Sequence, residues 1–173
     1  PIEKQKLQMP ELPASQSRVT LLRSSENVDY TQGVFILNED WFGHNNSTIN
    51  FMTSSGDFAY RIFQTANPGK ELGCTSQFGT IFGDNMFITS KQPKDGGASI
   101  EGGRLNVVDA KTMKVKAQFT DIGGGDGRAF LGVNDSVGYI GASNGIFLFD
   151  IKNLTVGDQL KGASNSGGLY NGQ

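Results

Sequence analysis

The loop 38–46 carries the side chains best suited to hold a ligand. It contains the one tryptophan of the chain, Trp41, and the one histidine, His44, together with Phe42 and Asn45. Aromatic rings offer broad apolar planes, and amide side chains both donate and accept hydrogen bonds. This combination suits a large, flat ligand that bears amides or sugar-like hydroxyls. Two plainer roles stay open: Trp41 packed between sheets, and His44 as an ordinary surface residue.

A second group of polar candidates lies in other loops and at strand ends. These ligand-binding candidates are Gln77, Lys91, Gln92, Asp126 and Arg128. The wider set of residues on this end also includes Asn46, in the first loop, and Asp95. An arginine and a lysine add charge-assisted hydrogen bonds to the amides of the first loop. We expect both groups to belong to one ligand-binding face, and no cofactor is expected.

Metal and phosphate motifs are missing from the sequence. A zinc ion needs three or four protein ligands, whereas His44 and Cys74 are each the only residue of their kind. The acidic loop 121–126 lacks the ligand spacing of a calcium-binding EF-hand. The glycine-rich segment 123–127 is not followed by the Gly-Lys-Ser/Thr of a phosphate-binding loop. Cys74 is expected to be a buried free thiol, because unpaired cysteines usually lie in the core.

Catalytic pairs are equally scarce. Acid–base catalysis needs a carboxylate with a histidine, lysine or second acid within reach. Only Asp126 with Arg128, and His44 near Glu39 and Asp40, come close, and neither set forms a recognised motif. We therefore expect a non-catalytic protein, and a propeller enzyme of the dehydrogenase-subunit, lactonase or lyase type is the less favoured alternative.

The element that positions these residues is a repeated hairpin. Residues 103–115 (GRLNVVDAKTMKV) recur as residues 145–156 (GIFLFDIKNLTV), with the aspartates Asp109 and Asp150 lying 41 residues apart (150 − 109). A fainter copy, residues 47–56, has Thr53 in the place of the aspartate. A period near 41 residues is typical of one propeller blade. The repeats, near 33–63, 77–119 and 129–160, predict an all-β propeller of four-stranded antiparallel blades.

Hydrophobic patterning predicts the individual strands. The continuous apolar runs 34–37 and 146–149 indicate strands buried on both faces. Residues 58–63 are expected to form a strand with Phe58, Tyr60 and Ile62 on one face. Hairpins are expected at 77–89 and 129–141, and 90–102 is expected to be a solvated loop.

The repeat register assigns every connection to one of two ends of the blades. Short turns share one end: 53–57, 83–85, 109–113, 134–136 and 150–154. The long connections share the other: 38–47, 64–76, 90–103, 121–128 and the brief 142–144. Because ligand-binding residues concentrate on loops held by a rigid scaffold, we expect the ligand to meet the end with the long loops.

Composition limits the remaining possibilities. The net charge of −2 gives no footprint for nucleic acid or anionic membrane, and no apolar run approaches the roughly 20 residues of a membrane span. Residues 1–17 are expected to form an extended N-terminal arm, and 18–173 a partial propeller in which strand 18–23 completes a blade. The chain begins at Pro1 without a methionine, so we expect a leader or lipoprotein segment upstream.

Residues 86–90 (MFITS) followed by 103–115 resemble the YVTN-type propeller repeat, and 139–143 with 145–156 resemble a second copy. The opening 33–39 (GVFILNE), with Phe42-Gly43 and 45–47, is similar to the start of YncE-like surface-layer propellers. The resemblance covers about 33–160. It implies a seven-bladed ring and a lipid-anchored place on the outer membrane, with a periplasmic place as the alternative.

Among the proteins that this chain resembles are propellers that capture cobalamin for a neighbouring outer-membrane transporter. The resemblance therefore implies a corrinoid ligand and a transporter partner as expectations for this chain. A structural or protein-interaction propeller is the main alternative. Three blades cannot close a ring, so either further blades downstream or a second chain must complete it, and the sequence favours a piece of a longer protein.

Overall fold

The computed structural model describes residues 28–40, 43–98 and 100–163. The predicted arm 1–17, the predicted strand 18–23, residues Trp41 and Phe42, and the tail 164–173 lie outside the described residues. The elements, in chain order, are β1 Gly33–Asn38, β2 Thr48–Thr53, β3 Phe58–Ala59, α1 Ile62–Ala66, β4 Cys74–Phe82, β5 Asn85–Gln92, β6 Leu105–Asp109, β7 Val115–Phe119, β8 Gly127–Gly132, β9 Val137–Ala142, β10 Gly145–Asp150 and β11 Thr155–Gln159. Within this part of the chain no helix is long and apolar enough to cross a membrane.

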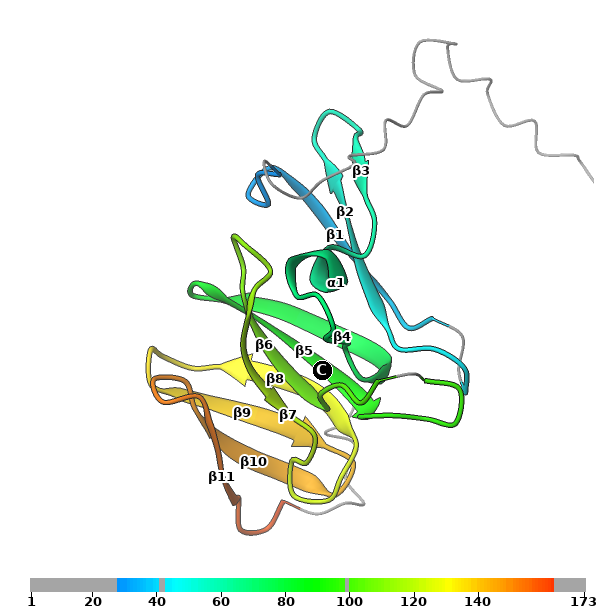
Figure 1. The fold of residues 1–173 in the computed structure, drawn as a ribbon. Coiled ribbons are helices and arrows are strands. Elements are labelled where there is room, and N and C mark those ends of the chain that lie inside the picture. Colours follow the sequence, from blue (N-terminus) through cyan, green and yellow to red (C-terminus); the bar gives the residue numbers. More distant parts are fainter. Residues whose placement is uncertain (1–27, 41–42, 99, 164–173) are drawn as a thin grey trace, which may run out of the picture.

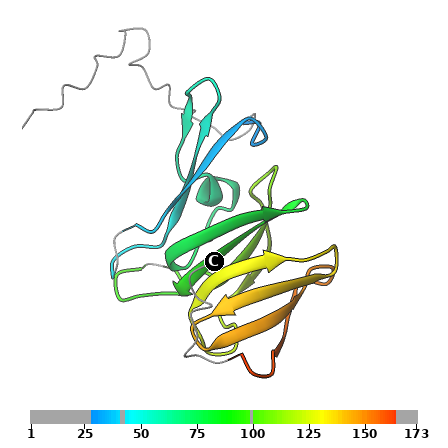
Figure 2. The same cartoon turned by 180° about the vertical axis from the view of Figure 1, so that it is seen from behind.

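The strands form three antiparallel sheets that follow one another along the chain. The first sheet has the order β1-β2-β3, the second β4-β5-β6-β7, and the third β8-β9-β10-β11. Figure 1 shows the three sheets stacked in that order, and Figure 2 shows the same stack from behind. The fold is therefore all-β, built of blade-like sheets, as the repeat predicts.

Two apolar clusters hold the stack together. The first lies between the first and second sheets and includes Phe51, Phe63 and Ile88, and the second lies between the second and third sheets and includes Phe87 and Phe130. The rings of Phe87 and Phe130 stack with centroids 3.8 Å apart. Burial of such aromatic faces is the main favourable term in folding, so each sheet is stabilised by its neighbours.

The direction of the strands shows which positions correspond between sheets. A side chain at Gly127 would strike the backbone of Ser90, which pairs with Ser76 near the start of β4. One at Gly132 would strike Phe82, the last residue of β4. Strand β8 therefore runs beside β4 in the same direction. β1 runs the opposite way, because Leu37 lies against Gly79 while Glu39, further along the chain, accepts a hydrogen bond from Gln77. The strands β1–β3 thus correspond to the second, third and fourth strands of the other sheets. The first sheet therefore has three strands among the described residues, and β1 takes a second-strand position.

The repeated hairpins share one turn geometry. In the second sheet Asp109 accepts hydrogen bonds from the backbone N–H groups of Lys111 and Thr112, at 2.9 and 3.0 Å, and Met113 adopts a left-handed conformation with φ 60°. In the third sheet Leu154 repeats this conformation with φ 51°. It lies 41 positions after Met113 (154 − 113), the same spacing as that between the two aspartates. An aspartate that caps its own turn explains why the motif recurs in sequence.

The turn aspartate predicts a pH dependence of stability. Partial burial alone would raise the pKa of Asp109, but the backbone N–H groups of Lys111 and Thr112 outweigh it and lower the pKa below its ordinary 3.8. The charged form is therefore favoured in the folded state, so its contribution is complete above the ordinary pKa and is lost as the pH falls through the lowered value. We expect wild type to melt above Asp109→Asn at neutral pH, with the difference shrinking in acid. A difference in melting temperature that stays constant across this range would contradict it.

The predicted strand 58–63 is wrong beyond its first residues. The strand ends at Ala59, and the chain then turns into the short helix α1. Arg61 takes a left-handed conformation, φ 50° and ψ 46°, which interrupts the extended backbone. Ile62 is buried and Tyr60 is 56% exposed, so they do not share a face as the period of two predicts. The helix forms because it places Ile62 and Phe63 in the first core cluster.

The predicted double-sided burial of runs 34–37 and 146–149 is also wrong. Phe147 and Phe149 are buried, but Leu148 between them is 37% exposed and Val34 is 55% exposed. Each run belongs to a sheet at one end of the described stack. Only one face of such a sheet meets a neighbour, so burial alternates.

The segment 90–102 is less solvated than expected. Strand β5 continues to Gln92, Ser90 is fully buried, and Ala98 is 7% exposed. Strand β4 begins at Cys74 rather than at Gln77. Cys74 is a free, buried cysteine, as predicted, and burial raises the pKa of its thiol.

Candidate functional site

Three long connections are joined by hydrogen bonds at one end of the first two sheets. Asn46, only 7% exposed, donates from Nδ2 to the carbonyl oxygens of Leu72 at 2.8 Å and Ile100 at 2.9 Å. The backbone N–H of Ser47 donates to Gly73 O at 2.9 Å. One buried amide thus ties the β1–β2, α1–β4 and β5–β6 connections into one loop-bearing end.

The connections of the third sheet lie at the same end. The N–H of Asp126 donates to Ser143 Oγ at 2.8 Å, and Arg104 reaches Asp121 in an ion pair of 3.7 Å. The short turns meet at the opposite end, where Ala110 N donates to Asp84 O at 2.9 Å. This arrangement follows the division of the connections that the repeat register predicts.

A polar cleft opens on the loop-bearing end of the first sheet. It is an open cleft of about 670 Å³, lined by Leu37, Asn38, Glu39, Asp40, Thr48, Asn50, Tyr60 and Arg61. A smaller hollow of about 280 Å³ is lined by Asp40, His44, Asn45, Asn46, Arg61, Glu71 and Gly97. Asp40 and Arg61 line both, so the two hollows form one polar cleft, and this name is kept below.

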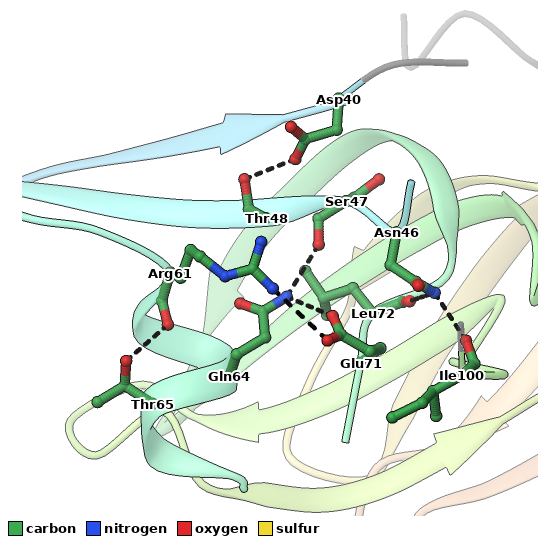
Figure 3. A network of polar contacts seen from close by, with 10 residues as sticks. All are labelled: Asp40, Asn46, Ser47, Thr48, Arg61, Gln64, Thr65, Glu71, Leu72 and Ile100. Carbon is green, nitrogen blue, oxygen red and sulfur yellow. Dashed lines mark hydrogen bonds and ion pairs between the residues drawn. The ribbon is translucent and has the colours of Figure 1, made fainter. Parts of the chain in front are cut away.

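Arg61 is held at the centre of the polar cleft by its backbone. Its N–H donates to Asn50 Oδ1 at 2.9 Å, and its carbonyl oxygen accepts from Thr65 N at 2.9 Å and Thr65 Oγ1 at 3.0 Å. Its left-handed conformation is unusual for a residue other than glycine and must be maintained by these contacts. The guanidinium is half-exposed and lies 3.5 Å from Glu71 Oε1 (Figure 3).

The floor beside Arg61 is a network of polar contacts. Gln64 donates from Nε2 to Glu71 Oε2 at 2.8 Å and to Ser47 O at 3.1 Å. Thr48 donates its hydroxyl to Asp40 Oδ2 at 2.7 Å across the cleft wall (Figure 3). Asp40 itself has a left-handed backbone with φ 61°. The carboxylates of Asp40 and Glu71 are thus fixed on either side of the guanidinium.

Part of the predicted ligand-binding set reaches this cleft. His44 and Asn45 line its smaller hollow. Gln77 donates to the carboxylate of Glu39 at 3.2 and 3.3 Å, which places it at the rim. Trp41 and Phe42 lie outside the described residues.

The other predicted residues lie away from the lining of the cleft. Lys91 and Gln92 end β5, and the carbonyl of Lys91 accepts from Arg104 Nε at 3.3 Å. Arg128, on β8, pairs with Asp126 at 3.1 Å, and its buried Nε has no hydrogen-bond partner among the described residues. These residues belong to the same end of the stack but not to the polar cleft.

Sequence reasoning missed the residues that shape the cleft most. Arg61, Glu71 and Gln64 fall where a strand and a loop are expected, because a five-residue helix leaves no readable periodicity. The period of two places Tyr60 on a strand face rather than in a site. The sequence indicates Asp40 and Glu39 only as partners of His44.

Chemical groups for metal binding are not gathered anywhere in the described part of the chain. No set of three histidine, cysteine, aspartate or glutamate side chains is placed to hold an ion there. What the polar cleft offers is a half-exposed cation, three carboxylates, several amides and the exposed ring of Tyr60. Such a surface can form many hydrogen bonds with a ligand of mixed donors and acceptors.

Fold and site together define a stack of blade-like sheets with a polar cleft at its loop-bearing end. A family model described as Domain of unknown function (DUF5074) matches residues 32–172, so the chain belongs to this family. The match takes in all three sheets and every residue of the polar cleft. Comparison with curated proteins gave no match.

Proposed function

We propose that this protein is a non-catalytic ligand-binding module of the cell surface. The polar cleft, centred on Arg61 with its backbone held by Asn50, is the observation that supports this role most strongly. Its lining comes from β1, β2, the segment before α1 and the three long connections that Asn46 ties together, and such preorganisation lowers the entropic cost of binding. By resemblance, the place of action is the outer-membrane surface through a lipid anchor, or else the periplasm.

The chemistry of the cleft favours a polar ligand that is not an anion. Glu39, Asp40 and Glu71 outnumber Arg61, which disfavours an anion. The ring of Tyr60, 56% exposed and packed on Phe58 with centroids 4.6 Å apart, offers a flat apolar platform beside the polar groups. A large ligand with a planar body and peripheral amides would use both features.

Cobalamin meets this description, and the resemblance to cobalamin-capturing surface propellers makes a corrinoid the first ligand to test. In this proposal the loop-bearing end takes up the corrinoid and passes it to an outer-membrane transporter. A protein-interaction role is the second candidate, favoured by the apolar residues that stay exposed on the first and third sheets, such as Val34 and Leu131.

The proposal is tested by titrating the full chain with cyanocobalamin in a calorimeter. Wild type is expected to bind, and Arg61→Asn is expected to bind about ten- to a hundredfold more weakly, because a charge-assisted hydrogen bond contributes about 1.5–3 kcal/mol. Asparagine tolerates the left-handed backbone of position 61, so the fold is kept. The matched control is Lys111→Asn in the opposite turn, with unchanged affinity.

Two results would count against the proposal. The absence of any heat at millimolar cyanocobalamin would remove the corrinoid, and equal affinity of wild type and Arg61→Asn would remove the polar cleft as its site. If Arg128→Asn lowers the affinity and Arg61→Asn does not, the binding site lies at the third sheet.

A further inference from the structure

The smaller hollow of the polar cleft is walled by connections of the first two sheets. Its lining lies between positions 40 and 97, in the connections that Asn46 ties together and in the turn before α1. It consists of two carboxylates, one guanidinium, one imidazole, two amides and a glycine: Asp40, Glu71, Arg61, His44, Asn45, Asn46 and Gly97. A hollow with this lining selects its ligand by the hydrogen-bond donors and acceptors that the ligand presents.

Two acceptors in the wall of this hollow have bonding capacity left. The carboxylate of Asp40 accepts a hydrogen bond from the hydroxyl of Thr48 at 2.7 Å, and no basic side chain of the described residues forms an ion pair with it. Asn46, 7% exposed, donates from Nδ2 to two carbonyl oxygens, and this fixes the orientation of its amide. Its Oδ1 accepts from no donor among the described residues, so this oxygen is available to a group inside the hollow.

The principal donor of the hollow is Arg61. Its guanidinium carries five N–H groups, and the ion pair with Glu71 at 3.5 Å is the one polar contact that it makes with the described residues. Glu71 is held in turn by Gln64, which donates to its other oxygen at 2.8 Å (Figure 3). The charges of Arg61 and Glu71 thus offset each other, while the charge of Asp40 stays without a basic partner in this part of the chain.

These groups distinguish between three kinds of ligand group. A carboxylate bonds to Arg61 but is repelled by Asp40. An ammonium group bonds to Asp40, but it is repelled by Arg61 and offers no acceptor to the guanidinium. A primary carboxamide carries no charge and has two N–H donors and one carbonyl acceptor, so it can bond to Asp40, Asn46 and Arg61 together.

We infer that the smaller hollow is a subsite for a primary carboxamide of the ligand. Its N–H groups donate to Asp40 and to Asn46 Oδ1, and its carbonyl oxygen accepts from the guanidinium of Arg61. The inference rests on the proposed function in taking the polar cleft as the binding site, but it does not require the ligand to be a corrinoid. The rest of the ligand occupies the larger hollow, where the ring of Tyr60 is exposed.

Three probes of similar size and different charge test this subsite: propionamide, propionate and propylammonium. The isotope-labelled full chain is titrated with each in turn, and the backbone signals of residues 43–47 are followed by nuclear magnetic resonance. Propionamide is expected to shift these signals and to saturate at millimolar concentration, the range expected of so small a ligand. Propionate and propylammonium are expected to bind about tenfold more weakly, because each meets a like charge in the hollow.

Asp40→Asn is expected to change the selectivity in a defined direction. Asparagine keeps an acceptor and tolerates the left-handed backbone of position 40, so the fold is expected to be kept, which thermal unfolding checks. The preference for propionamide over propionate is expected to fall about tenfold, because a donor has replaced the like charge. Asp135→Asn, in an exposed turn at the opposite end, is the matched control and should leave the preference unchanged.

The inference is overturned by any of three results. Propionamide could leave the signals of residues 43–47 unchanged. Propionate or propylammonium could bind as tightly as propionamide. Asp40→Asn could keep the preference of wild type although it melts like wild type.

A parallel titration with cyanocobalamin separates these results from a failure of the proposed function. If cyanocobalamin binds with an affinity that depends on Arg61 while propionamide does not bind, the subsite is wrong and the proposed function stands. If propionamide binds and Asp40→Asn shifts the preference as expected while cyanocobalamin does not bind, the corrinoid is wrong and the subsite stands.

Discussion

Replacing Phe149 with alanine is expected to lower the free energy of unfolding by about 3–5 kcal/mol, the usual cost of removing a buried aromatic ring. Phe149 is 1% exposed and meets three other rings edge-on. Its centroid lies 5.9 Å from that of Phe87, 5.8 Å from Phe119 and 5.5 Å from Phe130. The ring therefore joins the second sheet to the third, and its loss leaves a cavity in the contact between them.

Urea unfolding monitored by far-ultraviolet circular dichroism measures this effect. Ile81→Ala, at a residue that is 50% exposed, is the control and should cost less than about 1 kcal/mol. A loss below about 1 kcal/mol for Phe149→Ala would mean that the second and third sheets do not share this core.

Removal of the Asn67 side chain should have the next largest effect. Its Nδ2 donates to Phe63 O and to Met113 O, both at 2.8 Å, and its Oδ1 accepts from Val115 N at 2.9 Å. Asn67 is 9% exposed, so Asn67→Ala leaves buried backbone groups without partners. At about 1–3 kcal/mol for each group that stays unsatisfied, a total loss of about 3 kcal/mol is expected.

The same unfolding experiment tests this second substitution. Asn153→Ala removes an amide from an exposed turn and should change stability by less than about 1 kcal/mol. If Asn67→Ala and Asn153→Ala prove equally mild, the amide of Asn67 does not bridge α1 and the hairpin of the second sheet.

The sheets could be predicted because their signals are local. Asp109 and Asp150 each cap their own turn, and short apolar segments between turns mark the strands, so a single sequence carries both patterns. The equivalence of Asp109 and Asp150 predicts the hairpin β6–β7 and its copy β10–β11. The separation of long loops from short turns follows from the same register.

The segment after β3 and the cleft could not be predicted for a physical reason. Arg61 adopts a left-handed backbone that no propensity of arginine favours, and the bonds that maintain it come from Asn50 and Thr65. Glu71 reaches Arg61 only after α1 has reversed the chain. These contacts are tertiary, and tertiary contacts override local preference.

Only some of the predicted ligand-binding residues reach the polar cleft. His44 and Asn45 lie in the connection that was expected to bind, and they reach the smaller hollow of the cleft. Lys91 and Arg128 share only the loop-bearing end with them. The repeat register predicts at which end of the stack a residue lies. It does not predict which residues of a neighbouring sheet that residue will contact.

Hydrogen–deuterium exchange, with and without saturating cyanocobalamin, tests the central claim that ligand binds in the polar cleft at the loop-bearing end. Slower exchange is predicted in 43–50 and 60–73, which line the cleft, and unchanged exchange in the turns 109–114 and 150–154. Protection of those turns, or no change in either set of segments, would contradict it.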